Sequence, residues 1–491
     1  MRKLFALAAT ITAVTLPSGT QPAATEPASS ESTPTTQESP NLRSTAAQRD
    51  AVSITVYNQN FGLVREIRTL DLPSGRIALE YGDVASSIQP ETVYIRSLSG
   101  GPLQVLEQNY QFDLLSPQKL LEKYVGRMVN VYRTNPQTGV DEVIEAEVVS
   151  VNGGTILRIG GEITFNYPGR FGFPEVPDNL IAEPTLLWRL DATGGQQQIE
   201  VSYLTGGLNW KSDYVMVLNE DDDGAALTGW VTLTNQSGTA YENARLQLVA
   251  GEVQRVHGNM RPESRVRMMM VDAMAVRESD GFTENAFFEY HLYTLGRPTD
   301  LMNNEQKQVT LLESDDFGVE KKLIFHGATH YYRGQYGQIT SNQKVGVFLD
   351  FENSERNGLG MPLPKGVVRV YKRDHTGALQ FIGEDLIDHT PRDEELRIKM
   401  GEAFDVVADR RQMDYTVISR CVSESTWQID LRNHKDEDVE VMLVEPVGGD
   451  WQVLSSTHRF EKTDAWTFTL TPEVEARGET RVEYRVRVRW C

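Results

Sequence analysis

One segment of the sequence, residues 383–396 (GEDLIDHTPRDEEL), gathers ionisable side chains that could do acid–base chemistry. Asp388 and His389 are adjacent in it, and such a pair can form a base with its orienting carboxylate or part of a metal shell. The segment lies between two runs of strand-like alternation, however, and Pro391 favours a turn. We expect a solvated turn, and we name Asp388 and His389 as the catalytic candidates should the protein be an enzyme.

A second segment, residues 265–276 (RVRMMMVDAMAV), contains four methionines. Its apolar residues follow the spacing of an amphipathic helix, and thioethers are ligands that favour Cu(I). Asp272 is a hard ligand, and the nearest histidine, His257, is not at ligand spacing. We expect a linker or a loosely docked helix; contact with a partner or a membrane and a copper site are the alternatives.

Two further patterns are similar to metal motifs but lack essential ligands. Residues 219–227 (NEDDDGAAL) begin like a calcium loop, yet no closing acid follows Gly224, so a hairpin tip is predicted. His326 and His330 have the four-residue spacing of a zinc pair, but Gly327 and the β-forming neighbours argue against a helix. We predict neither a metal nor a cofactor, and the sequence has no nucleophile elbow, phosphate loop or dinucleotide fingerprint.

The two cysteines, Cys421 and Cys491, are the remaining residues with chemistry of their own. In an oxidising compartment they could form a disulfide. It would close a loop of roughly 70 residues, which the chain-entropy model values at about 3–4 kcal/mol. Two unpaired thiols are the alternative.

Charge and the first residues bound the class of protein. The 491-residue chain has a formal net charge of −21, which argues against nucleic acid and anionic lipid because both attract a basic face. Arg2 and Lys3 precede an apolar stretch at 4–16 that has signal-peptide length and is too short to span a membrane. No later stretch is long and apolar enough to do so. We expect an exported, soluble protein that is periplasmic or associated with the cell surface.

Strand-like alternation dominates the rest of the chain. In residues 481–490 (RVEYRVRVRW) the period of two is typical of a half-buried strand, with a basic binding stripe as the alternative for the arginines. One short helix is predicted after Ser116, with Pro117 at its first position and Gly126 beyond its end. Short strands with glycine turns follow, which favours a small barrel. The predicted fold class is all-β: two β-sandwich-like domains with a small inserted β-barrel and one short helix.

The predicted organisation has seven parts. They are a signal peptide (1–24), a disordered Ser/Thr/Pro-rich tether (25–49), an N-terminal β region (50–112), a short helix with a small β-barrel insertion (113–184), central β-sandwich strands (185–256), a Met-rich linker (257–284) and a C-terminal β-sandwich (285–491). The tether is predicted to be disordered because it has almost no apolar residues to bury.

The central strands carry a family resemblance. The stretch LNWKSDYVMVL, followed by LTGWVTLTNQSGTAYENARLQLVAGEV, resembles the core signature of the bacterial DUF4139 domain and, more distantly, the mucoidy-inhibitor group. The matching residues are Trp210, Tyr214, Asn235, Gly238, Asn243, Leu246 and Gly251. The resemblance extends from about Val52 to Trp490 and implies a β-sandwich fold in an exported or envelope-associated protein. The family is one of unknown function, so the resemblance implies no reaction and gives no catalytic residue to carry over. Alternation places Trp210 and Tyr214 on one side of a strand, so we expect both rings in one core, with a sugar-gripping pair as the alternative.

These observations leave two main hypotheses of function. The first is a non-catalytic exported protein of the bacterial envelope, a β-sandwich scaffold or binding module whose partner is another envelope protein or a glycan. The second is an envelope hydrolase acting on carbohydrate or peptide, which needs a cleft with two close carboxylates, or a carboxylate and a histidine, at shifted pKa values. An extracytoplasmic metal-handling protein is a third alternative. The sequence does not give the oligomeric state.

Overall fold

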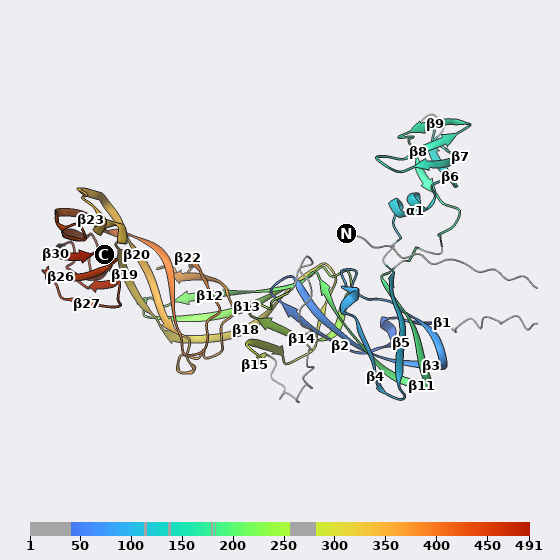
Figure 1. Ribbon diagram of the computed structural model, residues 1–491, viewed down its shortest axis with the longest axis horizontal. Coiled ribbons are helices and arrows are strands. Elements are labelled where there is room, and N and C mark those ends of the chain that lie inside the picture. The colour runs from blue at the N-terminus through green and yellow to red at the C-terminus, as the bar shows by residue number, and fades with distance from the viewer. Residues whose placement is uncertain (1–40, 112–114, 136–138, 178–179, 182, 256–280) are drawn as a thin grey trace, which may run out of the picture. The chain divides into compact units, whose positions relative to one another are not determined.

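The computed structural model describes residues 41–111, 115–135, 139–177, 180–181, 183–255 and 281–491 (Figure 1). Within these ranges the protein is all-β, as predicted: strands form four sheets, and α1 (Pro117–Lys123) is the single α-helix. No α-helix in the described ranges is long and apolar enough to cross a membrane. The predicted signal peptide (1–24) and most of the predicted Met-rich linker (257–284) lie outside them.

The first sheet is built on one long antiparallel pair. β3 (Phe61–Tyr81) and β11 (Thr185–Gly206) pair from Phe61 opposite Gly206 to Tyr81 opposite Leu186. The other strands of the sheet are β1 (Asn41–Ser44), β2 (Arg49–Tyr57), β4 (Tyr94–Ser99), β5 (Leu103–Gln111), β14 (Tyr241–Ala250), β15 (Phe282–Phe287), β16 (Tyr290–Leu295) and β17 (Thr299–Leu301). The order is β15-β16-β14-β2-β3-β11-β4, with β1 on β3, β17 on β14 and β5 on β11.

Residues 25–40 of the predicted tether (25–49) lie outside the described residues, and residues 41–49 are ordered. Residues 41–44 form β1, which pairs in parallel with the end of β3, and the 3-10 turn η1 (Ala46–Gln48) follows. Ser44 is buried, and its hydroxyl accepts a hydrogen bond from the Arg68 guanidinium (Nη1–Oγ 3.3 Å). The prediction of disorder was therefore wrong for residues 41–49. Arg68 is a buried hydrogen-bond partner for this polar segment, and the composition of the segment alone does not indicate that such a partner exists.

The insertion between β5 and β11 forms a sheet of its own. Its strands are β6 (Met128–Thr134), β7 (Asp141–Ser150), β8 (Ile156–Ile159), β9 (Glu162–Phe165) and β10 (Arg170–Gly172), in the order β10-β6-β7-β8-β9 around a separate hydrophobic core. α1 begins as predicted, because Ser116 Oγ accepts a hydrogen bond from the Lys119 amide (3.2 Å) and Pro117 takes the first position. The described residues show no pairing between β9 and β10, so strand pairing does not close the predicted small barrel.

Two more sheets contain the remaining strands. The third sheet has the order β18 (Glu305–Gly318), β13 (Gly224–Asn235), β12 (Leu208–Leu218), β21 (Gly366–Arg373) and β22 (Leu379–Ile387). The fourth has the order β26 (Asp450–Ser456), β30 (Glu479–Arg489), β24 (Val422–Asn433), β23 (Glu395–Ser419), β20 (Gln338–Glu352), β19 (Glu320–His326), β25 (Val439–Pro446), β28 (Thr467–Leu470) and β27 (Phe460–Lys462), with β29 (Glu473–Val474) on β25. The 3-10 turns η2 (Pro90–Thr92), η3 (Thr329–Arg333) and η4 (Glu355–Asn357) lie between strands.

The sheets do not follow the predicted linear domains. β12 and β13 come from the predicted central block (185–256), yet they pair with β21 and β18 from the predicted C-terminal block (285–491). β14 comes from the same central block and pairs with β2 of the N-terminal region. The predicted boundaries therefore do not separate independent sandwiches. Alternation identifies which side chains face a core, but it does not identify the neighbouring strand.

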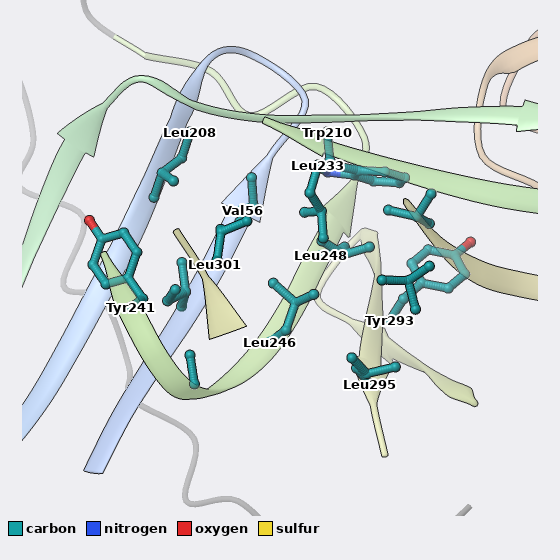
Figure 2. Packing of buried hydrophobic residues seen from close by; sticks show 14 of the residues in the cluster. Val56, Leu208, Trp210, Leu233, Tyr241, Leu246, Leu248, Tyr293, Leu295 and Leu301 are labelled. Carbon is teal, nitrogen blue, oxygen red and sulfur yellow. The ribbon is translucent and has the colours of Figure 1, made fainter. Parts of the chain in front are cut away.

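Trp210 and Tyr214 both enter the core, as predicted. They are 2% and 0% exposed, and Figure 2 shows Trp210 among labelled residues from the first and third sheets. The Trp210 indole donates a hydrogen bond to the Val249 carbonyl (3.2 Å), and the Tyr214 hydroxyl donates one to the Pro364 carbonyl (2.7 Å). Rings buried in this way cannot grip a sugar, so the alternative interpretation of the pair was wrong.

β30 is a half-buried strand, as its alternation predicts. Its apolar face is Val482, Tyr484, Val486 and Val488, each at most 1% exposed. On the other face Arg485 and Arg487 both form ion pairs with Glu424 on β24 (N–O 2.6 Å each). These arginines are therefore neutralised within the sheet, which weakens the alternative of a basic binding stripe.

Among the described residues two ion pairs are completely buried, one in each ten-stranded sheet. In the first sheet Glu66 accepts hydrogen bonds from the Arg68 guanidinium (Nη2–Oε2 2.7 Å) and the Tyr81 hydroxyl (3.1 Å). In the fourth sheet the Arg410 guanidinium donates to both carboxylate oxygens of Glu445, at 2.9 and 2.6 Å. A buried pair of this kind tolerates the loss of water only while both charges remain and their hydrogen bonds are satisfied.

The structure joins Cys421 and Cys491 in a disulfide, with 5.4 Å between their Cα atoms. Cys421 lies in the turn between β23 and β24, and Cys491 follows β30. The Trp490 amide donates a hydrogen bond to the Cys421 carbonyl (2.8 Å), so backbone and disulfide hold the same two segments together.

We expect Glu445→Gln to lower the free energy of unfolding by about 3–5 kcal/mol, because it leaves the Arg410 guanidinium buried without a countercharge. Urea denaturation at pH 7 measures the change. Arg477→Gln is the matched control: the Arg477–Asp436 pair is exposed, so its removal should leave the denaturation midpoint unchanged. Equal effects of the two variants would contradict the importance assigned to the buried pair.

We expect Cys421→Ser with Cys491→Ser to lower the free energy of unfolding by about 4 kcal/mol. Without the disulfide the unfolded chain has a higher conformational entropy, and this stabilises the unfolded state. Urea denaturation with and without reductant measures this. The reductant should destabilise the wild type to the level of the double variant and leave the double variant unchanged. A wild type insensitive to reductant after unfolding would contradict the pairing.

Candidate functional site

The structure does not bring Asp388 and His389 together as a base and its orienting carboxylate. Both lie in the loop after β22, where the Asp388 side chain is 90% exposed and 3.5 Å from Lys365 Nζ. His389 Nδ1 instead accepts a hydrogen bond from the Lys365 backbone amide (3.1 Å). The loop between β22 and β23 is thus the turn that the sequence predicts, and the histidine acts within it as a hydrogen-bond acceptor.

The sequence patterns similar to metal motifs do not converge on a metal site. Among the described residues, no group of three or more His, Cys, Asp or Glu side chains could hold an ion. Residues 219–223 are the predicted hairpin tip between β12 and β13, and Asp222 there pairs with Lys321 and Lys372. His326 ends β19 and His330 lies in η3, so they occupy different elements. The Met-rich segment 265–276 lies outside the described residues.

A surface depression of about 290 Å³ lies over three neighbouring strands of the fourth sheet. Its lining residues are Ile324, Phe325 and His326 from β19, Gln343, Lys344, Gly346 and Phe348 from β20, and Lys399 and Glu402 from β23. The depression combines aromatic surface with charged and polar groups from different strands. That combination is typical of a site for a small ligand or a short segment of a larger one.

A large β-bulge shapes the edge of this depression. Gly346 lies opposite Glu402 and Lys344 lies opposite Val407, so β23 advances five residues while β20 advances two. Residues 403–406 lie where β20 has only Val345, and they turn one aromatic ring outward: Phe404 is 84% exposed. The Lys344 ammonium lies 4.9 Å from the centre of that ring. Bulges often redirect side chains next to functional sites, and here the bulge places an exposed ring beside a lysine.

The depression is electropositive in a chain of net charge −21. Lys344 and Lys399 form no ion pair with any described carboxylate, and Glu402 is the only acidic residue in the lining. Burial lowers the pKa of His326, and the positive charges of Arg397 and Lys399 lower it further, against the opposing effect of Glu445. Its ring is therefore neutral at pH 7 and can donate one N–H.

This arrangement can bind an anion. Two ammonium groups and an imidazole N–H are donors for a carboxylate, a sulfate or a phosphate, and Phe348 and Phe404 offer apolar surface beside them. The lining provides one carboxylate, Glu402, and it makes no hydrogen bond to His326 among the described contacts. The depression therefore has no second carboxylate, and its one carboxylate and one histidine are not joined by a hydrogen bond among the described contacts, so the structure does not show them as an acid–base pair.

Sequence reasoning did not find this site. It considered His326 only with His330, at zinc-pair spacing, and it did not consider Lys344 or Lys399. These residues are separated by up to 73 positions (399 − 326) and meet because β19, β20 and β23 are neighbours in the sheet. A pattern of nearby residues carries no information about that order.

Comparison with known proteins does not assign the chain. No protein-family model matches it, and no curated protein matches it either. The interpretation of the depression therefore depends on its own chemistry.

We expect Lys399→Gln to raise the pKa of His326 and to leave that of His389 unchanged, because Lys399 opposes protonation only of the first ring. Lys365→Gln should do the reverse, since Lys365 faces His389. NMR titration of histidine-labelled protein measures both values in each variant. Equal shifts of the two histidines in either variant would contradict the placement of these charges.

Proposed function

We propose that the protein is an exported, non-catalytic binding protein of the bacterial envelope that takes an acidic glycan in the depression of the fourth sheet. The observation that carries this proposal is a pair of lysines, Lys344 and Lys399, that form no ion pair with a carboxylate in the part of the chain that the structure describes, in a chain of net charge −21. Cations kept unpaired on an acidic protein favour an anionic ligand, because the rest of the surface repels one.

A sugar acid fits the remaining features of the site. A uronic acid unit has a carboxylate for the ammonium groups and an apolar C–H face that can lie on an aromatic ring. Phe404 offers such a ring, and the Lys344 ammonium beside it places the charge next to the stacking surface. The volume of about 290 Å³ is near the lower limit of ligand pockets, which suits one or two sugar units.

Export is supported by two independent observations. Residues 1–24 have the charge and hydropathy pattern of a signal peptide, although they lie outside the described residues. The Cys421–Cys491 disulfide supports an oxidising compartment, where such bonds persist. The resemblance to DUF4139 also implies an exported or envelope-associated protein, and membership of that family is part of the proposal.

We expect an oligogalacturonate to bind and a neutral oligosaccharide of the same length not to bind. Lys344→Gln with Lys399→Gln should weaken the acidic ligand at least tenfold, and binding should weaken as salt is raised because the contacts are ionic. Isothermal titration calorimetry measures each affinity. Lys435→Gln is the matched control, since Lys435 pairs with Glu437 in the turn between β24 and β25.

Three results would contradict the proposal. Equal binding of the neutral oligosaccharide would show that charge does not drive binding. An unchanged affinity in the double lysine variant would show that the ligand does not bind in this depression. Release of shorter oligosaccharides during the titration would show a hydrolase instead of a binding protein. Tighter binding of poly-glutamate than of oligogalacturonate would indicate an acidic protein partner in place of a glycan.

A further inference from the structure

The segment before β21, residues 361–365 (MPLPK), forms a strap between two sheets. The Pro362 carbonyl accepts a hydrogen bond from the Tyr293 hydroxyl on β16 (2.8 Å), and the Pro364 carbonyl accepts one from the Tyr214 hydroxyl on β12 (2.7 Å). Both tyrosines are almost fully buried. Because β16 belongs to the first sheet and β12 to the third, the strap connects the two sheets through their buried hydroxyls.

Asn353 and one loop hold this strap in place: the Asn353 side-chain amide donates a hydrogen bond to the Met361 carbonyl (2.9 Å), and the loop binds the residues that follow. The two prolines have no N–H, so the attachment depends on the amides of the residues between and after them. The Leu363 amide donates to the Thr390 carbonyl (2.8 Å), and Thr390 returns a bond to the Leu363 carbonyl (2.9 Å). The Lys365 amide donates to His389 Nδ1 (3.1 Å). Both partners lie in the loop between β22 and β23.

The bond from Lys365 requires a neutral His389. An imidazole nitrogen accepts a hydrogen bond only when it carries no proton, and in the protonated ring both nitrogens are donors. Protonation at Nδ1 would therefore set two donors against each other and remove one of the bonds that hold the strap. The other bond of the loop, between Thr390 and Leu363, does not titrate.

Charged groups from several elements face the His389 ring. Lys365 in the strap and His291 on β16 oppose its protonation, whereas Asp388 in the same loop and Glu252 after β14 favour it. Desolvation is the largest influence and lowers the pKa of His389, although the residue is exposed at the surface, and the Lys365 charge follows. The ring is therefore neutral at pH 7, which agrees with its role as an acceptor.

We propose that His389 is a pH-sensitive latch: acid protonates its ring, releases the Lys365 amide and loosens the strap that joins β16 to β12. The direction follows from proton linkage. The open segment, in which the ring has its ordinary pKa near 6.5, binds the proton more readily than the closed one. The latch is thus fully closed above about pH 6.5 and loosens progressively as the pH falls below that value.

Hydrogen exchange of the folded protein tests the latch. Between pH 7.5 and pH 5, after correction for the intrinsic exchange rate, exchange in residues 361–366 should increase in the wild type. Between the ordinary pKa near 6.5 and the lowered pKa of the closed segment, the increase should approach at most tenfold per pH unit, the limit for linkage to one proton. In His389→Asn the increase should be absent, because an Asn oxygen near the position of Nδ1 accepts from Lys365 at every pH.

Control variants make each outcome decisive. His389→Ala has no acceptor, so the strap should exchange rapidly at both pH values. His291→Asn and His326→Asn keep the latch and should retain the pH dependence of the wild type. The latch is contradicted if His389→Asn keeps the full acid response, or if the wild type shows none. If the acid response disappeared only in His291→Asn, His291 and not His389 would be the histidine responsible, and the latch at His389 would be contradicted. None of these outcomes depends on the proposed glycan.

Discussion

The buried pair of Arg410 and Glu445 is the interaction on which the fourth sheet depends. Removing two charges from water costs several kcal/mol each. The cost is offset by the bidentate contact and by hydrogen bonds with two buried tyrosine hydroxyls, while Arg410 Nε has no hydrogen-bond partner among the described residues. The pair also fixes the end of β19. A Cβ on Gly327 would lie 2.3 Å from a Glu445 oxygen, so the chain passes the carboxylate without a side chain. His326, the preceding residue, is thereby held beside the depression.

The sequence predicts well those features that depend on residues close together in the chain. Alternation gives the all-β class and the burial of Trp210, and the start of α1 follows from Ser116 and the proline after it. The candidate site, in contrast, depends on residues that are far apart in the chain. Lys344 and Lys399 meet through sheet order and through a bulge of β23, and both depend on contacts between segments distant in the chain. The linear division into domains failed for the same reason, since strands of one sheet come from several parts of the sequence.

The structure contains the same polar anchor twice: a buried asparagine at the end of a strand. Asn235 ends β13 and Asn433 ends β24, and both are buried. Each side-chain amide lies within hydrogen-bond distance of three backbone carbonyls, one of them four residues later, and each side-chain oxygen accepts the amide two residues later. A buried amide satisfied in this way fixes the path of the chain as it leaves a strand. Asn235 is therefore a structural anchor.

The insertion between β5 and β11 has a consequence for how the molecule can be rebuilt. Gln111 and Thr185 are opposite each other in the register of these two strands, so the chain departs and returns at adjacent points. The intervening sheet has its own hydrophobic core. A tight turn joining residue 111 directly to residue 185 would therefore convert β5 and β11 into an ordinary hairpin. An unrelated small domain could be inserted between the same two residues, so this position is a suitable site for domain insertion.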